Sequence, residues 1–343
     1  MIKNRNFTLY QKAALVNSLI SSKIWYAAHT YPLPVSFVKL INKVIFQFIW
    51  NSQADHIKRD ILCSPRLNGG IGLINIELKA KSIFTATTIK ILIKSEDESL
   101  IRYYIMAKIN KITKLGNSPK ETSICCTPYY EKAIENVKKI HTMKNFPNVN
   151  SKEIYLSTLP KIKPRVEIQY PNYNWNKIWK NLNYKYINVM DRCIVYKFLH
   201  EILPTNKRLK QMRIKNDSKC NYCSDEDSLM HKFYHCHKIR NSVNWLTKFI
   251  EDVCNIKINN MSEYLMLDFP YINRKMVNTL SVIICNYIAC IWLNRDDLEY
   301  IDKKLKAKII RERSFLSYIH RDKFKQVFCS RYCDLKFNQM NYR

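Results

Sequence analysis

The sequence predicts a mainly α-helical fold, and two features of the chain lead to that prediction. Apolar residues recur at helical spacing along most of the patterned segments, starting with residues 8–29. Prolines then separate these segments, as in "YPLP" at 31–34 and at Pro204, because proline cannot continue a helix. A run of helices joined by short breaks is therefore expected.

The first helix is expected over 8–29, with Thr8 as its N-cap and an apolar stripe that starts at Leu9. A second helix follows "YPLP" over 35–50. The residues expected to face inward from this second helix are Phe37, Leu40, Ile41, Val44, Ile45, Phe48 and Ile49. Three of the chain's four glycines then form "GGIG" at 69–72, which lacks the G-K-[ST] ending of a phosphate loop and predicts a turn that needs positive φ. A third helix is expected over about 77–94.

The middle of the chain is weakly patterned, and helices return from residue 171 onward. Residues 95–170 carry five prolines and predict a helical connector with loops. "NWNKIWKNLNYKYI" then places Trp175 and Trp179 on one helical face, for which core packing is favoured over base stacking. Further helices are expected over 191–214, interrupted at Pro204, and over 241–254, 275–293 and 298–325, the last with a basic face.

Charge and length limit the partners of the chain. Lys and Arg number 57 against 28 Asp and Glu, so the net charge is +29, which predicts nucleic acid as the partner. The longest apolar run, 280–293, is shorter than the twenty or so residues that span a bilayer, so no membrane-spanning helix is expected. No signal peptide, disulfide framework or small-molecule site is expected either. These features predict a reducing compartment, nucleus or cytoplasm.

A compact group of cysteines and histidines, "KCNYCSDEDSLMHKFYHCHK", lies at 219–238. Cys220 and Cys223 have the C-x2-C spacing of a knuckle that supplies two ligands to a tetrahedral Zn²⁺. His231 and Cys236 complete a C-x2-C-x7-H-x4-C pattern. His235, one helical turn after His231, is the alternative fourth ligand. A redox function of the knuckle would need a βαβ context, which the pattern does not show. One structural zinc ion per chain is therefore predicted.

Basic residues gather just before this group, after Pro204. Lys207, Arg208, Lys210 and Arg213 lie along a short predicted helix that Thr205 can cap. Exposed amides and cationic side chains at a helix start can bind phosphate, so these four residues are candidate nucleic-acid contacts. An ordinary solvated basic face is an equally good interpretation.

Two blocks of the sequence resemble reverse transcriptases of LINE-type (non-long-terminal-repeat) retrotransposons. "FLHEILPTNKRLKQMRI", followed by "CNYCSDEDSLMHKFYHC", resembles the H-x-x-L-P-T-x-x-R-L block and the CCHC zinc-binding domain of that family. "TLYQKAALVNSLISSKIWYAAHTYPLP", "INKVIFQFIW", "IKRDILCSPRLNGGIGL" and "ELKAKS" are similar to its thumb region. The resemblance covers about 1–95 and 175–295. It implies a thumb-like bundle (1–95), a connector (96–170), a helical region (171–216), a CCHC module (217–240) and C-terminal helices (241–343).

The resemblance also implies roles for residues and partners. It makes Cys220, Cys223, His231 and Cys236 the zinc ligands, and template RNA and target DNA of the element the partners. The chain departs from the family in lacking the Y/F-x-D-D pair of the catalytic palm; its one adjacent Asp pair, Asp296-Asp297, falls in a polar turn. No catalytic residue and no enzyme activity are therefore expected of this chain, which looks like the product of a truncated element. Two alternatives remain: a part of an active polymerase whose palm is supplied upstream or in trans, and a decayed relic.

Overall fold

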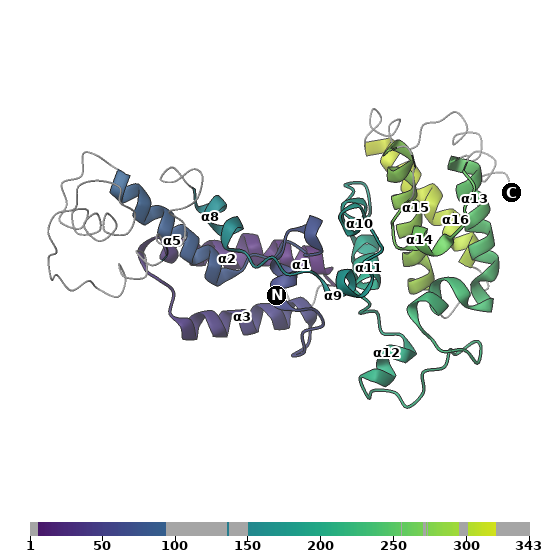
Figure 1. Ribbon diagram of the computed structural model, residues 1–343, viewed down its shortest axis with the longest axis horizontal. Coiled ribbons are helices and arrows are strands. Elements are labelled where there is room, and N and C mark those ends of the chain that lie inside the picture. Colours follow the sequence, from purple (N-terminus) through teal and green to yellow (C-terminus); the bar gives the residue numbers. More distant parts are fainter. Residues whose placement is uncertain are drawn as a thin grey trace. The chain divides into compact units, whose positions relative to one another are not determined.

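The computed structural model describes residues 6–93, 136, 150–254, 256–269, 272, 274–294 and 301–319. The regular elements within these ranges are helices, and the prediction of a mainly α fold is confirmed (Figure 1). The chain divides into two compact units: unit 1 comprises Met1–Pro65 and Gly70–Ile162, and unit 2 comprises Arg66–Gly69 and Lys163–Arg343. Most of the predicted connector, 96–170, lies outside the described residues, and the predicted domain boundaries stay predictions.

Unit 1 is a helical assembly built around α2 and α5. Its elements are α1 (Leu9–Leu15), a π-helical turn (Val16–Ile20), α2 (Ser21–Thr30), α3 (Val35–Trp50), α4 (Arg59–Cys63), α5 (Ile76–Ile93) and α8 (Ser151–Thr158). Thr8 caps α1 as predicted, in a reciprocal box with Gln11. A buried lysine, Lys12, provides hydrogen-bond donors at the C-terminal end of α3. Its Nζ donates to the carbonyls of Phe48 and Ile49 and to Asn51 Oδ1.

The predicted inward face of the second helix is partly wrong. Ile45 and Ile49 are buried as expected, but the exposed fractions of Phe37, Leu40 and Val44 are 41%, 63% and 55%. The residues that α3 buries are Val38, Ile45, Phe46 and Ile49. Because α3 is apolar over most of its circumference, its periodicity cannot determine which side packs inward.

The "GGIG" turn has the backbone that the sequence predicted. Gly69 and Gly72 have φ of 77° and 72°, a region that favours glycine. A Cβ on Gly70 would lie 1.9 Å from the carbonyl oxygen of Ser64, so only glycine fits there. The turn therefore has a structural role.

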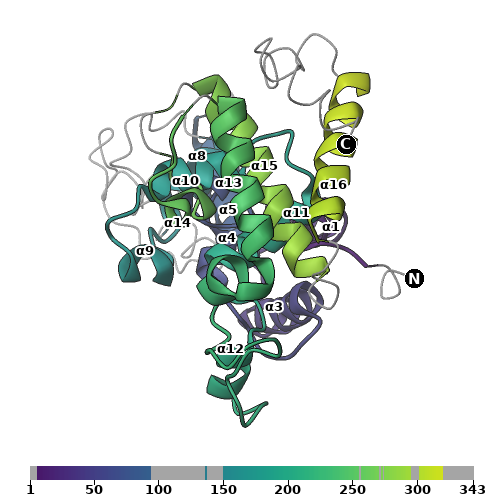
Figure 2. The same ribbon diagram turned by 90° about the vertical axis from the view of Figure 1, so that its right-hand side faces the viewer.

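Unit 2 holds the remaining helices. Its elements are the short 3₁₀ turn Arg66–Asn68, α9 (Arg165–Gln169), α10 (Trp175–Leu182), α11 (Val189–Leu199), α12 (Asn206–Gln211), a π-helical turn (His231–His235), a 3₁₀ turn (His237–Ile239), α13 (Arg240–Cys254), α14 (Met261–Leu265), α15 (Arg274–Leu293) and α16 (Ile301–Ile319). Trp175 and Trp179 are buried, as the core interpretation predicted. Figures 1 and 2 both place α12 at one end of this unit.

One packing contact of unit 2 joins the segment Arg66–Gly69 to the core of this unit. Gly69 packs against the Trp179 ring, and its carbonyl oxygen lies 3.0 Å from both Tyr196 Oη and His200 Nε2. His200 stacks on Trp179 at 5.1 Å between ring centroids. Burial, partly offset by the bond to Gly69, lowers the pKa of His200 to about 4, so this histidine is neutral at pH 7.

The last two described helices differ in composition: α15 is strongly apolar, whereas α16 carries many lysines. In α15 the window Met276–Leu293 is long and apolar enough to cross a membrane, but 72% of it is buried within the protein, so it gives no evidence for a membrane protein. The predicted basic face of α16 included Lys306 and Lys308, and for these two residues it is wrong, because Lys308 pairs with the buried Asp191 at 2.7 Å and Lys306 lies over the Trp245 ring. These two lysines pack inward, where a lysine stem can cover apolar surface. The predicted continuation of this helix beyond 319 lies outside the described residues.

Candidate metal centre

The first half of the Cys/His cluster is a tight turn closed by backbone hydrogen bonds. Lys219 and Glu226 form an isolated antiparallel bridge. The N–H of Cys220 donates to the Asp225 carbonyl, and the N–H of Asp227 donates to the Ser218 carbonyl, both at 2.8 Å. Cys220 and Cys223 lie inside this small loop, so their thiols are presented on one side.

The second half of the cluster is the π-helical turn His231–His235. Ser228 Oγ accepts from the N–H of His231 at 3.1 Å and so fixes the start of the turn. The N–H of Cys236 donates to the carbonyl of His231 at 2.8 Å, five residues back. This i→i+5 bond returns Cys236 to the side of His231, because a π turn is wider than an α turn. His231 is thus the first residue of the turn, and Cys236 follows its last residue.

The four predicted ligand atoms converge on one point. They all lie within 4.8 Å of one another. Cys220 Sγ and Cys236 Sγ are 4.0 Å apart, and Cys223 Sγ and His231 Nε2 are 3.1 Å apart. In a tetrahedral zinc site with bonds of about 2.0–2.3 Å, ligand atoms are separated by roughly 3.5–3.8 Å. The cluster can therefore hold one metal ion, and three sulfurs with one imidazole nitrogen suit zinc.

The structure separates the two candidate fourth ligands. Cys236 is buried within the cluster, whereas His235 is exposed and lies against the Tyr234 ring, 4.7 Å between centroids. The geometry therefore favours Cys236 over His235.

Burial favours the uncharged forms of side chains in the cluster. Burial raises the pKa of the Cys236 thiol to about 12, and burial also raises the pKa of Cys223. For His231, burial lowers the pKa, which favours the neutral imidazole that binds metals. His231 Nδ1 lies 3.9 Å from Asp225 Oδ2, on the side away from Cys223. A carboxylate near the second nitrogen is the usual companion of a metal-bound histidine.

The module is anchored in unit 2 through Phe233, in the middle of the π turn. This side chain is fully buried and meets the ring of Phe198 edge-on, at 5.0 Å between centroids. Its carbonyl accepts a hydrogen bond of 2.8 Å from Tyr287 Oη. Because Phe198 belongs to α11 and Tyr287 to α15, the metal cluster is attached directly to the helical core of this unit.

A buried carboxylate joins the cluster to α12. Asp227 Oδ2 accepts from the N–H of Asn206, and the Asp227 carbonyl accepts from the N–H of Lys207. Thr205 caps the helix as predicted and accepts from the N–H of Arg208. The first amides of α12 thus have partners within the chain and are not open to phosphate.

The four residues predicted to contact nucleic acid differ in their contacts within the chain. Lys207 pairs with Glu226 at 2.6 Å, and Arg208 donates to the Glu201 carbonyl. Lys210 and Arg213 are exposed. That these residues contact nucleic acid stays a prediction. Sequence reasoning missed the contact between Asp227 and Asn206, although the polar "TN" after Pro204 and the acidic loop "SDED" were visible signals.

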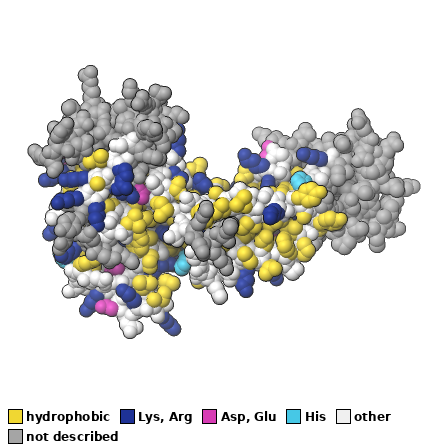
Figure 3. Space-filling view, turned by 180° about the vertical axis from the view of Figure 1, so that it is seen from behind, with side chains coloured by type: hydrophobic (Ala, Val, Ile, Leu, Met, Phe, Trp, Pro, Cys, Tyr) yellow, Lys and Arg dark blue, Asp and Glu magenta, His cyan; other side chains and the backbone are white. Residues whose placement is uncertain are grey.

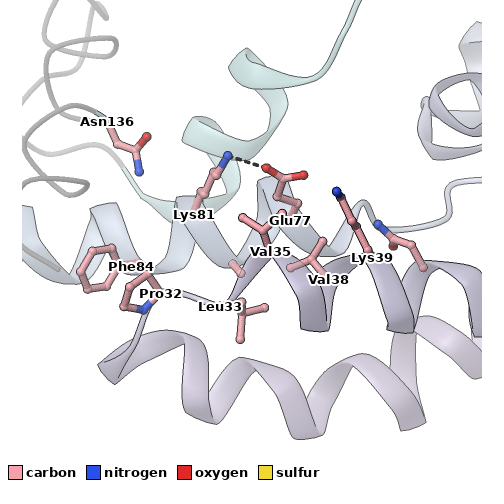
Figure 4. Close-up of a pocket in the computed structure, with 11 residues that line it drawn as sticks. Pro32, Leu33, Val35, Val38, Lys39, Glu77, Lys81, Phe84 and Asn136 are labelled. Atoms are coloured by element: carbon pink, nitrogen blue, oxygen red, sulfur yellow. Dashed lines mark hydrogen bonds and ion pairs between the residues drawn. The ribbon is translucent and has the colours of Figure 1, made fainter. Parts of the chain in front are cut away.

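A cavity of about 320 Å³ lies in unit 1 between α3 and α5 (Figure 4). Its walls are mostly apolar, with Leu33, Val38 and Phe84 among them. Lys81 and Glu77 at its edge pair with each other at 2.6 Å. Its charged groups are thus partly satisfied within the chain, and we assign no chemistry to it.

Comparison with known families agrees with the centre that the geometry outlines. Residues 151–242 match the family model for zinc-binding in reverse transcriptase. The matched segment covers about a quarter of the chain and contains all four residues of the cluster. No curated protein matches the chain. The chain therefore contains a reverse-transcriptase-related zinc-binding module.

Proposed function

We propose that this chain is the nucleic-acid-binding C-terminal part of a LINE-type (non-LTR) retrotransposon reverse transcriptase. The observation that carries the proposal is that the reverse-transcriptase zinc-binding match, 151–242, coincides with four converging ligand atoms. In this proposal one zinc ion, held by Cys220, Cys223, His231 and Cys236, has a structural role. Its four ligands are all supplied by the chain, as in closed structural sites.

The proposed partners are element RNA and target DNA, and the main argument is charge. The chain carries a net charge of +29. On the face shown in Figure 3, Lys and Arg side chains are widespread and acidic ones are few. Such an excess is the electrostatic pattern of a protein that binds phosphate backbones. We place the protein in the nucleus or cytoplasm, where free thiols persist.

We further propose that the chain has no polymerase activity by itself. Nucleotidyl transfer uses carboxylates that hold two metal ions, and the Y/F-x-D-D motif of the family is absent from the sequence. The adjacent pair Asp296-Asp297 lies outside the described residues. Two other functions compete: a part of an active polymerase whose palm is supplied upstream or in trans, and a relic without function.

The salt dependence of binding tests the proposal. If about six phosphates of a single strand are neutralised, log K plotted against log[salt] has a slope near −4. Fluorescence anisotropy with a labelled RNA oligonucleotide measures this slope. Absence of binding at low salt, or a flat dependence, would contradict the proposed function. Primer extension with Mg²⁺ or Mn²⁺ above that of a heat-inactivated control would show instead that the chain is a polymerase.

A further inference from the structure

A polar cavity of about 250 Å³ lies beside the metal cluster, between the start of α12 and the cysteine knuckle. Its apolar walls come from Pro204 and Leu209. The aromatic residue Tyr222, which lies between Cys220 and Cys223 in the sequence, also lines it. Its polar walls include Lys215, Lys232 and Asp227. All of these residues belong to unit 2. The cavity is thus part of the same module as the metal centre.

Two lysines at the cavity are each held in place by a partner from unit 2. Lys215 Nζ donates to Asn206 Oδ1 at 2.9 Å, and Lys232 Nζ pairs with Asp227 Oδ1 at 3.3 Å. Asn206 is itself fixed, because its amide nitrogen donates to the carbonyl of Lys219 at 2.7 Å. An ammonium group has three donors, so each lysine retains donors for a ligand.

A buried carboxylate positions one of these lysines. Asp227 is 2% exposed, and its Oδ2 accepts from the N–H of Asn206 at 2.8 Å. Its Oδ1 is buried as well and has Lys232 as its ion-pair partner. Asp227 therefore offsets the charge of Lys232 and holds this lysine at the cavity wall.

The combination of groups selects the ligand. The lining offers lysine donors, the side-chain amide of Asn221 and the aromatic side chain of Tyr222, and the charge of one of its two lysines, Lys232, is already offset by Asp227. A phosphate offers only acceptors and negative charge, whereas a nucleobase has donors and acceptors on one edge and a flat face for an aromatic ring. The volume, below the range of drug-sized pockets, suits a single base. We propose that this cavity receives one unpaired nucleobase of a bound single strand.

This inference rests on the proposed function, because it assumes that the chain binds nucleic acid. It adds a preference that charge alone does not produce. Bases in a duplex are paired and stacked, so they reach a pocket only after extrusion. Binding should therefore be tighter to a single strand than to its duplex, and weaker to a strand whose bases have been removed.

The test uses the full chain, loaded with zinc, and three 12-nucleotide probes at one salt concentration. The probes are a mixed-sequence single strand, its duplex, and the same single strand with abasic central positions. Base–aromatic contacts of this kind change affinity by roughly tenfold, so the intact strand should bind about tenfold more tightly than the abasic one. Lys215→Met should remove most of this difference.

Lys210→Met provides a matched control. Lys210 is exposed on α12, is absent from the cavity lining, and its substitution changes the net charge by the same amount. We expect it to weaken binding to all three probes equally. Tyr222→Phe should keep the difference between intact and abasic strands, and Tyr222→Ala should lose it. Zinc content and circular dichroism identify any variant that has lost its fold, and Asn221→Ala replaces Tyr222→Ala in that case.

The outcomes separate the inference from the proposed function. If the wild-type chain binds intact and abasic strands equally, or if Lys215→Met and Lys210→Met weaken all probes alike, the base pocket is overturned while nucleic-acid binding stands. If the wild-type chain binds no probe at low salt, both fail.

Discussion

The Asp227 carboxylate accepts a hydrogen bond of 2.8 Å from the backbone N–H of Asn206, the first residue of α12. This contact joins the acidic loop of the metal module to the helix that follows Pro204. It places a negative charge at the helix start, where the helix dipole stabilises it. The segment that follows Pro204 and the cysteine cluster are thus parts of one packed structure within unit 2.

Substitution of Asp227 should destabilise unit 2. In Asp227→Ala, the buried Asn206 loses the acceptor of its N–H, and the partly buried Lys232 loses its ion-pair partner. We expect a loss of about 2–4 kcal/mol in the free energy of unfolding, measured by urea titration. Glu226→Ala is the control: its pair with Lys207 has both side chains about half exposed, and its removal should cost less than about 1 kcal/mol. Equal losses of unfolding free energy in the two variants would show that the contacts of Asp227 stabilise unit 2 no more than an exposed ion pair does.

Lys12 should stabilise unit 1 through the end of α3. Lys12→Met keeps most of the buried stem but leaves the carbonyls of Phe48 and Ile49 without this donor. The expected cost is about 1–3 kcal/mol, with faster hydrogen exchange in the last turn of α3. Lys39→Met, an exposed position on the same helix, should leave exchange unchanged. Unchanged exchange in Lys12→Met would contradict the capping role.

His200 should make unit 2 less stable as the pH falls. Its pKa in the folded protein, about 4, is below the ordinary value of 6.5, so the unfolded chain binds the proton more readily. The stability contribution of neutral His200 is therefore fully present above pH 6.5 and is lost as the pH falls from 6.5 toward 4, by at most about 1.4 kcal/mol per pH unit.

His200→Gln isolates this effect, because glutamine can still donate to the Gly69 carbonyl but does not titrate. Unfolding of both proteins is followed between pH 7 and 5. We expect the difference in stability between wild type and variant to shrink as the pH falls. A difference that is independent of pH would mean that His200 is not responsible.

The metal cluster was predictable from the sequence because its signals are local. Cys220 and Cys223 are three residues apart, and His231 and Cys236 are linked by one π-helical turn. The choice between Cys236 and His235 needed the structure, because an α turn would have placed His231 and His235 on one side. The caps at Thr8 and Thr205 were likewise readable, since a cap depends only on the next three residues.

Features that depend on distant parts of the chain were not predictable. The periodicity of α3 could not show that Leu40 and Val44 are exposed, because apolar residues occupy both of its faces. The phosphate-binding interpretation of α12 overlooked Asp227, which reaches its first amide from 21 residues away. Contacts such as that between Gly69 and His200, 131 residues apart, follow from tertiary packing and leave no local pattern.

Metal content of the freshly purified, reduced chain tests the central claim most directly. Structural zinc contributes an apparent binding free energy of about 10–16 kcal/mol, so it should survive purification. We predict one zinc per chain in the wild type, in His235→Ala and in Cys254→Ser, and loss of the metal in Cys220→Ser and Cys236→Ser. No metal in the wild type, or zinc released by His235→Ala but retained by Cys236→Ser, would contradict the account.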